Sequence, residues 1–404
     1  MAGEIINRLN VGPVVNVKLT DSSVTNGQNL VDAYNYAKTL TPNGAALSAT
    51  NRVSVIIQPG NYTLAAELAV DTQFVDLIGL GAMKLRRGAT PLVIIDGNTL
   101  NVTANDVRVQ GVSVGTQAFK IGTHLPLQIF EDCAGGDSSF TNSLVSGTFV
   151  NCTGGNYSFG GVESSTGGTL DGTFQDCTGG DYSFGGGSDG GNGGTLSGTF
   201  QDCTGGDYSF GSGSDGGTLN GTFKDCTGGT YSFGGGGDSA GGTLSGTFKD
   251  CTGETYSFGS GLDTAGDLTS TSVFTNCTGG DRSFGGGGTG GGTLSGTFKD
   301  CTGGEYSFGG GEGGGGGNLT STSVFTNCTG GDYSFGGASG GNAGTLSGTF
   351  QDCTGGDSSF GGGSSGTATG KFYQCRLTSG TFITVTGAGL MRNCIDGNNN
   401  IVDQ

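Results

Sequence analysis

The sequence predicts an all-β solenoid with about 25 residues in each coil and a short N-terminal helix that caps the first coil. Close copies of residues 195–211, TLSGTFQDCTGGDYSFG, recur from about residue 130 to residue 375. Each copy holds one cysteine, and successive cysteines are mostly 22 to 27 residues apart. A glycine-rich run of variable length follows each copy, which is typical of a surface loop. Because one such unit cannot bury its own apolar face, the units are expected to stack.

Spacing inside the repeat predicts which side chains face the interior. Leucine precedes most repeat cysteines by seven residues or, at Leu268 and Leu319, by nine, and phenylalanine follows the repeat cysteines by seven. Two extra residues preserve strand alternation and therefore keep the inner face inside. Alternation places Leu196, Gly198 and Phe200 on that inner face. The predicted core ladder is Cys133, Cys152, Cys177, Cys203, Cys226, Cys251, Cys277, Cys301, Cys328, Cys353, Cys375 and Cys394 together with Phe174, Phe200, Phe223, Phe248, Phe298 and Phe350.

Bends are expected at two places in each coil. Asp202 precedes the cysteine and tolerates left-handed turn geometry, and the aspartates and asparagines at this position are expected to stack as a ladder. A second bend at 205–206 leads to Tyr208 and Phe210, which share strand parity. With the glycine-rich loop as the third bend, three short strands would close each coil.

The repeat resembles a known architecture. Its Phe-x-[Asp/Asn]-Cys pattern, with a bend at the acidic or amide residue and variable loops confined to one corner, resembles the single-stranded right-handed parallel β-helix of the pectate-lyase-like superfamily. The resemblance implies a right-handed parallel β-helix. That fold hosts lyases, hydrolases, adhesins and inert rods, so it does not select an activity.

The N-terminal part lacks the strict repeat. We expect an extended attachment segment over 1–25, a helix from Gln28 to Leu40, and β-helix coils that begin near Arg52. The expected strands are Val53–Ile57, Pro59–Tyr62, Phe74–Gly79, Leu92–Ile95, Leu100–Val102 and Val107–Val114. A helix followed by Ile-Ile-Gln-Pro-Gly-Asn-Tyr and Leu-Ile-Gly-Leu-Gly resembles, over about residues 26–125, the opening of pectate-lyase-like proteins in tailed-phage tail spikes, fibres and other virion components.

Composition divides the chain. All five prolines precede the repeats, which indicates a boundary near residue 127. The expected divisions are an attachment segment over 1–25, the capping helix and irregular coils over 26–126, the cysteine-containing repeats over 127–375, and a C-terminal coil and cap over 376–404.

Charge and cysteine content exclude several classes of function. The net charge of -18, with only 16 lysines and arginines, argues against nucleic acid as a partner. No apolar run approaches ~20 residues, so no membrane insertion is expected. The N-terminus shows no basic segment followed by an apolar core, so no signal peptide is expected and synthesis is assigned to the host cytoplasm. The twelve cysteines are expected to be buried free thiols, because stacked parallel Cβ vectors are poorly aimed for disulfides.

The candidate catalytic residues are the acids of the repeats and two irregular residues. Every acid recurs from coil to coil, whereas a catalytic pair should break the pattern once, so no catalytic residue is predicted. Arg282 replaces the usual tyrosine, and His124 is the only histidine, which leaves histidine chemistry with almost no support. The acids are Asp181, Asp207, Asp281, Glu305, Asp332 and Asp357 after the glycine pair and Asp202, Asp225 and Asp250 at the bend.

Ligand-binding patterns are weak. Residues 185–191 and 214–217 resemble Gly/Asp-rich calcium β-rolls but lack their nine-residue period, so no cofactor or metal is predicted, with calcium in these loops as the alternative. The chain has no tryptophan, and its repeat tyrosines share parity with the inward phenylalanines, which disfavours them as a glycan platform. A threonine column over 178–354 is compatible with ice binding, but β-branched residues also simply suit strands.

These observations favour a non-catalytic β-helical rod, and the resemblance implies a phage virion component such as a tail spike, tail fibre or other surface fibre. Other virion proteins would bind its N-terminal segment, and its glycine-rich edge would meet sister chains or a host surface, including cell-surface glycan. A homotrimer is expected by analogy with such spikes. The alternatives are a polysaccharide-degrading tail-spike enzyme, either a lyase or a glycoside hydrolase, and a secreted adhesin or extracellular filament subunit.

Overall fold

The computed structural model describes residues 13–81, 91–114, 119–122, 125–163, 166–188, 190–363 and 365–404. Within these ranges the chain is nearly all β, with one α-helix near the N-terminus, and it forms a parallel β-helix as predicted. Two compact units make up the chain. Unit 1 comprises residues 1–159 and 171–179, and unit 2 comprises residues 160–170 and 180–404.

The helix of unit 1, α1 (Ser23–Ala37), begins and ends earlier than the predicted Gln28–Leu40. The Ser22 hydroxyl caps it by accepting a hydrogen bond from the Thr25 amide at 3.3 Å, as N-cap serines commonly do. The predicted start was too late because it rested on the spacing of apolar residues, and the first turn of the helix is mostly polar. The helix packs mainly against β3 (Gly60–Thr63), where a Cβ on Gly27 would overlap the Thr63 carbonyl oxygen. A short 3-10 turn, η2 (Pro42–Gly44), follows.

The strands of unit 1 form three parallel groups, and most of them lie where the sequence predicted strands. Two strands, β4 (Leu68–Val70) and β10 (Phe119–Ile121), were not predicted. Gly111, at φ 66°, splits the predicted run 107–114 into β8 (Arg108–Gln110) and β9 (Val112–Val114). The first group is β1 (Val14–Asn16), β2 (Val53–Ile57), β5 (Val75–Gly79), β8 (Arg108–Gln110), β11 (Ile129–Glu131), β14 (Thr148–Val150) and β16 (Thr173–Gln175). The second is β3, β6 (Val93–Asp96), β9 (Val112–Val114) and β12 (Ala134–Gly135), and the third is β4 (Leu68–Val70), β7 (Leu100–Val102) and β10 (Phe119–Ile121). Strand β13 (Leu144–Val145) also lies in this unit.

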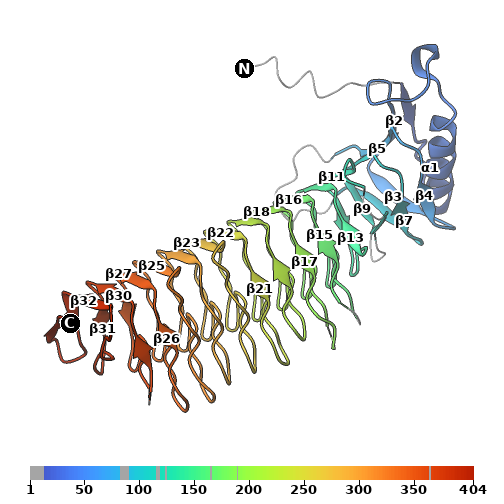
Figure 1. The fold of residues 1–404 in the computed structure, drawn as a ribbon. Helices are drawn as coiled ribbons and strands as arrows, with labels where there is room; N and C mark the ends of the chain where they lie inside the picture. The colour runs from blue at the N-terminus through green and yellow to red at the C-terminus, as the bar shows by residue number, and fades with distance from the viewer. Residues whose placement is uncertain are drawn as a thin grey trace. The chain divides into compact units, whose positions relative to one another are not determined.

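The strands of unit 2 repeat coil by coil, and Figure 1 shows β18 to β32 in chain order along the stack. Its longest parallel run is β18 (Thr199–Gln201), β20 (Thr222–Lys224), β22 (Thr247–Lys249), β23 (Val273–Thr275), β24 (Thr297–Lys299), β25 (Val324–Thr326), β27 (Thr349–Gln351), β30 (Lys371–Tyr373) and β32 (Leu390–Arg392). A second run is β15 (Thr169–Leu170), β17 (Thr195–Leu196), β19 (Thr218–Leu219) and β21 (Thr243–Leu244), and β26 (Thr345–Leu346) pairs with β29 (Thr367–Ala368). A third is β28 (Thr354–Gly355), β31 (Arg376–Leu377), β33 (Cys394–Ile395) and β34 (Ile401–Val402), in which the last pair is antiparallel.

Strand register in unit 2 aligns like residues. Phe200 pairs with Phe223, and Phe223 with Phe248. Their rings stack at centroid distances of 4.8 Å with interplanar angles of 3° and 2°. A second phenylalanine column that includes Phe233 meets these rings edge-on, at 85° to Phe248. The interior of the coil is therefore two interlocked aromatic columns, an arrangement in which each ring has both stacked and edge-to-face neighbours.

All twelve cysteines are buried, and none of them forms a disulfide. In unit 2 the Cys226 thiol donates weak hydrogen bonds to the carbonyl oxygens of Lys224 at 3.3 Å and Phe200 at 3.5 Å. In unit 1 burial raises the pKa of Cys152 well above its ordinary value. These thiols are therefore small core residues enclosed by the coils.

The Tyr-Ser-Phe segment is not the third strand that the sequence predicted. Tyr208 and Phe210 both adopt left-handed backbone conformations, at φ 53° and 54°. Ser209 between them is fully buried, whereas Tyr208 is only half-buried. Strand parity fails here because two left-handed residues turn the chain and bring both Ser209 and Phe210 inward. Each such residue costs roughly 1–2 kcal/mol of conformational free energy, which burial of a phenylalanine offsets.

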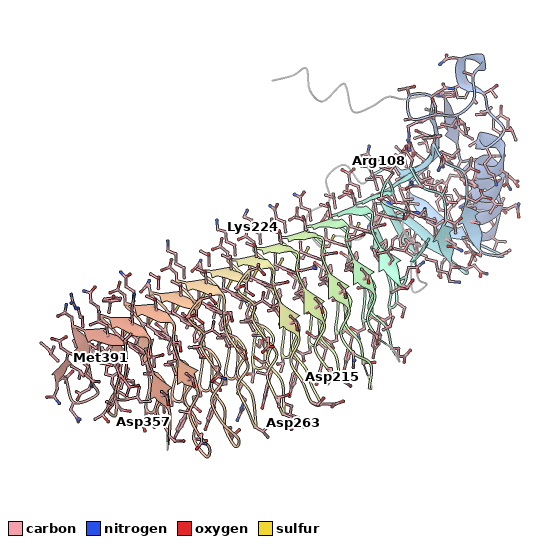
Figure 2. All side chains as sticks on the ribbon, viewed as in Figure 1. Arg108, Asp215, Lys224, Asp263, Asp357 and Met391 are labelled. Carbon is pink, nitrogen blue, oxygen red and sulfur yellow. The ribbon has the colours of Figure 1, made fainter. Side chains whose placement is uncertain are left out.

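The glycine-rich runs of unit 2 are paired segments rather than the predicted loops. We call residues 211–217, 234–242, 259–266, 285–292, 309–317 and 336–344 the glycine arms. Their outgoing halves form parallel bridges from Gly213 to Gly236 and onward to Ala338, and their returning halves form a second series. A Cβ on Gly216 would overlap the Gly234 carbonyl oxygen of the next arm, and a Cβ on Gly236 would overlap the Ala240 carbonyl oxygen of its own arm. Successive arms, and the two halves of one arm, therefore pack backbone against backbone. Figure 2 shows Asp215 near an arm tip, on the side of unit 2 away from Lys224.

The C-terminal residue covers the last strand of unit 2. The Met391 amide donates to the Gln404 carbonyl oxygen at 2.9 Å, and the Gln404 amide donates back at 3.1 Å. This exchange satisfies main-chain groups of β32 that would otherwise form an open sheet edge.

Candidate functional site

The acids that follow the glycine pairs join successive coils of unit 2. The Asp181 carboxylate accepts the Asp207 amide at 3.0 Å, and Asp207 accepts the Thr230 amide at 2.8 Å. A Cβ on Gly206 would overlap the Asp181 carboxylate, and a Cβ on Gly304 would overlap the Asp281 carboxylate, which explains the glycine at these two positions. In the same way the Asp281 carboxylate accepts the Glu305 amide at 2.9 Å, and the Asp332 carboxylate accepts the Asp357 amide at 2.6 Å. These carboxylates hold the stack together and do not converge as a pair.

The bend acids form the expected ladder. Asp202, Asp225 and Asp250 have φ of 53° to 54°, and Asn276 donates its amide to Asp250 at 2.7 Å. Lys224 lies 3.2 Å from Asp225 on an exposed face, where such pairs contribute little to stability. Their role is to turn the chain.

A half-buried tyrosine column runs along unit 2 beside the glycine arms. We call Tyr182, Tyr208, Tyr231, Tyr256, Tyr306 and Tyr333 the tyrosine column. Neighbouring rings have centroids 4.8 to 5.0 Å apart and interplanar angles of 8° to 14°. Because the ring faces are stacked on one another, the column presents mainly ring edges and hydroxyl groups to solvent. This geometry leaves few faces on which a sugar ring could stack.

Arg282 fills the one gap in the tyrosine column. Its guanidinium lies 5.2 Å from the Tyr256 ring centroid and 5.3 Å from that of Tyr306, and it pairs with Glu312. Cation–π contacts of this kind replace the missing ring. The arginine that replaces tyrosine in this coil thus has its charge neutralised within the column.

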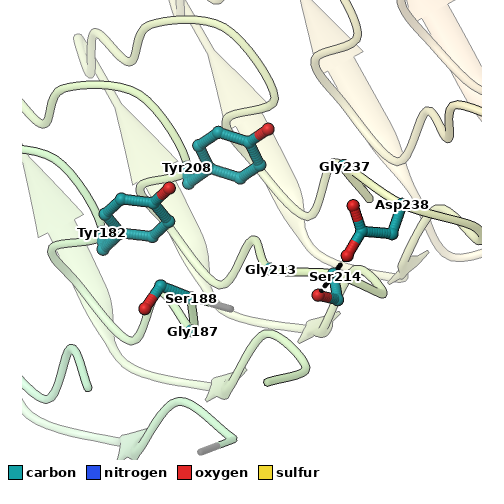
Figure 3. A pocket seen from close by; sticks show the side chains of 8 residues that line it. All are labelled: Tyr182, Gly187, Ser188, Tyr208, Gly213, Ser214, Gly237 and Asp238. Atoms are coloured by element: carbon teal, nitrogen blue, oxygen red, sulfur yellow. Dashed lines mark hydrogen bonds between the residues drawn. The ribbon is translucent and has the colours of Figure 1, made fainter. Parts of the chain in front are cut away.

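A small polar pocket opens beside the first two column tyrosines. Its volume is about 100 Å³, and it is lined by Tyr182, Tyr208, Ser188, Ser214 and Asp238 with three glycines. Figure 3 shows the two phenol groups on one side and the Ser214–Asp238 hydrogen bond, 2.7 Å long, on the other. Burial is the largest cause that raises the pKa of Tyr208 to about 12, and the charges of the neighbouring Tyr231, Tyr182 and Asp238 raise it further. The pocket has the size of a few water molecules.

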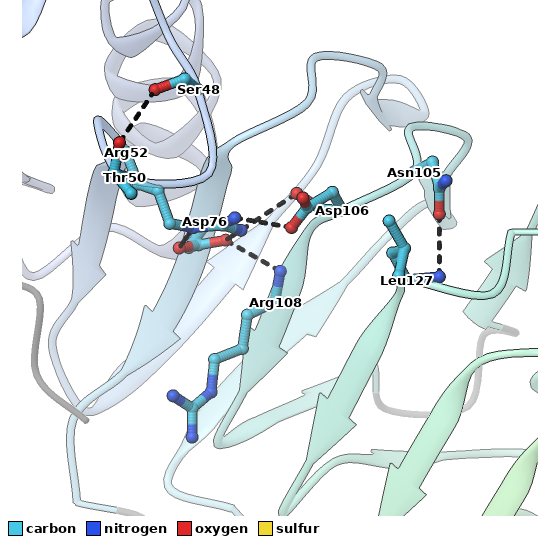
Figure 4. A network of polar contacts seen from close by, with 8 residues as sticks. All are labelled: Ser48, Thr50, Arg52, Asp76, Asn105, Asp106, Arg108 and Leu127. Carbon is cyan, nitrogen blue, oxygen red and sulfur yellow. Dashed lines mark hydrogen bonds and ion pairs between the residues drawn. The ribbon is translucent and has the colours of Figure 1, made fainter. Parts of the chain in front are cut away.

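Unit 1 carries an ionic network that sequence reasoning missed (Figure 4). The Arg52 guanidinium contacts Asp76 at 2.5 Å and Asp106 at 2.6 Å, and the Arg108 amide donates to Asp76 at 2.8 Å. Hydrogen bonding to Asp76 raises the pKa of Arg52. The residues are 24 to 54 positions apart in the part of the chain without a repeat, so no spacing signal pointed to them. The network clamps neighbouring coils together.

Of the other positions named from the sequence, the structure describes the threonine column and part of the calcium-like stretches. Thr204 and Thr227 continue as a column of main-chain bridges to Thr354. Asp215 in the second calcium-like stretch accepts the Ala240 amide at 3.1 Å. Asp189, in the first such stretch, and His124 lie outside the described residues. Among the residues that the structure describes, no three histidine, cysteine or acidic side chains are grouped to hold a metal ion. In the same ranges no helix has the length and apolar character needed to cross a membrane.

Comparison with known proteins gives little. No family model and no curated protein matches the chain. One solved structure that is similar is a phage protein, Geobacillus virus E2 ORF18, with 9% identity and a TM-score of 0.19. The match covers 97% of this chain but 62% of that one.

Proposed function

We propose that this protein is a non-catalytic structural component of a phage virion, a β-helical rod of the tail-spike or tail-fibre kind. One observation carries the structural role. The repeated carboxylates of unit 2 bind main-chain amides of the next coil, as Asp181 and Asp207 do, and so serve the stack. The virion assignment is supported by the resemblance of residues 26–125 to the opening of phage β-helix proteins.

The proposal extends to partners. The segment 1–25 would bind other virion proteins, the chain would assemble as a homotrimer, and its outer surface would meet the host, including cell-surface glycan. No metal or cofactor is required for this role, because the coils are joined by main-chain hydrogen bonds and by buried aromatic columns.

Three experiments test the proposal. Mass spectrometry of purified virions should find the chain as a stoichiometric component, and light scattering of the isolated protein should give the mass of a trimer. Incubation with a panel of acidic polysaccharides should release neither reducing ends nor unsaturated uronates. Release of either product would replace the proposal with the enzyme alternative, and recovery only from a cell-surface fraction would replace it with the adhesin alternative.

A further inference from the structure

The tyrosine column places phenol groups from successive coils in direct contact. Tyr182 and Tyr208 have ring centroids 5.0 Å apart, Tyr208 and Tyr231 4.8 Å, and Tyr231 and Tyr256 4.8 Å. Arg282 then interrupts the column. Contacting tyrosines are 23 to 27 residues apart in sequence. A covalent bond between two such rings would therefore join one coil to the next.

Access and proximity both favour chemistry at these rings. The column tyrosines are half-buried, and the pocket of about 100 Å³ opens on Tyr182 and Tyr208. A molecule as small as hydrogen peroxide fits a pocket of this size. Two reacting groups held in contact by a rigid scaffold react as if present at very high concentration. The stack supplies that scaffold, because main-chain bonds such as Tyr208 amide to Thr230 carbonyl, at 2.9 Å, fix each tyrosine to the adjoining coil.

We propose that the tyrosine column is a site of oxidative cross-linking, at which a peroxide-driven one-electron oxidation joins neighbouring tyrosines as dityrosine. Each of two phenols loses one electron and one proton to the oxidant. The two tyrosyl radicals form one carbon–carbon bond between ring positions ortho to the oxygens. Each ring then moves the hydrogen of that carbon to its own oxygen and becomes aromatic again. Overall, two phenols and one hydrogen peroxide give one dityrosine and two waters.

The proposal is independent of the virion assignment and specifies which pairs form. Four pairs are expected: Tyr182–Tyr208, Tyr208–Tyr231, Tyr231–Tyr256 and Tyr306–Tyr333. No bond is expected between Tyr256 and Tyr306, because the Arg282 side chain lies between their rings. Each bond closes a coil onto its neighbour and opposes separation of the stack. Tyr36, which is 59% exposed on α1 and outside the column, serves as an internal reference.

The test treats the full-length protein with a haem peroxidase and hydrogen peroxide. Dityrosine fluorescence should appear, and peptide mass spectrometry should find the four pairs at the summed peptide mass less two hydrogens. Their yield should not change when the protein is diluted tenfold, whereas any coupling through Tyr36 should fall. The oxidised protein should unfold at higher urea concentration than the untreated protein. Oxidation that modifies Tyr36 but leaves the column uncoupled, or that joins tyrosines not adjacent in the column, would overturn the proposal.

Two variants sharpen this result. Tyr231→Phe keeps a stacked ring but has no phenol oxygen, so both pairs through position 231 should disappear while Tyr182–Tyr208 and Tyr306–Tyr333 remain. Arg282→Tyr restores the residue type found in the neighbouring coils, so new pairs should join position 282 to Tyr256 and to Tyr306. Melting temperatures measured before oxidation show whether each variant folds. A folded Arg282→Tyr protein without new pairs, or unchanged pairing in Tyr231→Phe, contradicts contact-directed coupling.

Discussion

The glycine arms provide the most direct test of the fold, because loose loops and packed arms respond oppositely to the same substitution. A Cβ on Gly216 would overlap backbone atoms of Gly234 and Gly242, so no side chain can move aside. Overpacking of this kind costs about 1–3 kcal/mol. Displacing the arm would also weaken the 2.8 Å bond from the Gly216 amide to the Ala240 carbonyl, which contributes roughly 1 kcal/mol. Alanine offsets about 0.4–1 kcal/mol through the unfolded state. Gly216→Ala should therefore lower the free energy of unfolding by roughly 1–3 kcal/mol.

Gly290→Ala is the matched control in the same kind of arm. The nearest atom to a Cβ there is the Gly315 carbonyl oxygen at 3.9 Å, and its φ is not positive. This variant should be stabilised by about 0.4–1 kcal/mol. Urea unfolding followed by circular dichroism measures both free energies, and hydrogen exchange reports the arms locally. If both variants gained stability equally, the arms would be loops and the packed description would be wrong.

Three further predictions concern the core and the tyrosine column. Phe248→Ala should lower the free energy of unfolding in urea by about 3–5 kcal/mol, because that ring is fully buried. Thr247→Ala, at the exposed neighbouring residue, should change this free energy by less than about 0.5 kcal/mol. Equal effects of the two substitutions would contradict the aromatic columns. Folding raises the pKa of Tyr208 from 10.0 to about 12, so its contribution to stability is complete below pH 10 and is lost as pH rises through about 12. Tyr208→Phe should therefore make the free energy of unfolding depend less on pH in this alkaline range. An unchanged dependence on pH would refute this prediction. The twelve buried thiols should react with a thiol reagent only after unfolding, and rapid labelling of the folded protein would contradict their burial.

Sequence spacing predicted the parts of the coil in which packing fixes position. Leu268 shows this clearly: it stands two residues further from its cysteine than Leu244 does, yet both are fully buried. The extra residues make a turn in which the Ser272 amide donates to the Thr269 carbonyl at 3.0 Å. The inner face is preserved because the insertion is even. Asp202 was also predictable, because an acid before an inward cysteine marks a left-handed bend.

The parts that sequence did not predict are those where one residue type serves two opposite purposes. Glycine permits loose loops and also permits backbone to touch backbone, as at Gly216; composition alone cannot separate these uses. Tyrosine and phenylalanine two residues apart signal a strand face, but Tyr208 and Phe210 are left-handed turn residues. The Arg52 network depends on contacts across 24 to 54 residues, which no local pattern encodes.

Repetition itself explains how the acids of unit 2 are used in the stack. In a stack of like coils, an acid at one position finds the same backbone beside it in the next coil, so Asp181 and Asp207 both bind an amide of the adjoining coil. Each of these carboxylates therefore joins its own coil to the next one, about 4.8 Å away along the stack. Only a departure from the repeat places a side chain beside residues of a different kind in the neighbouring coils. Arg282 is such a departure, but the rings of Tyr256 and Tyr306 and the Glu312 carboxylate enclose its charge. What the repetition creates instead is contact between identical groups, and for phenols such contact favours coupling to one another over action on a bound substrate.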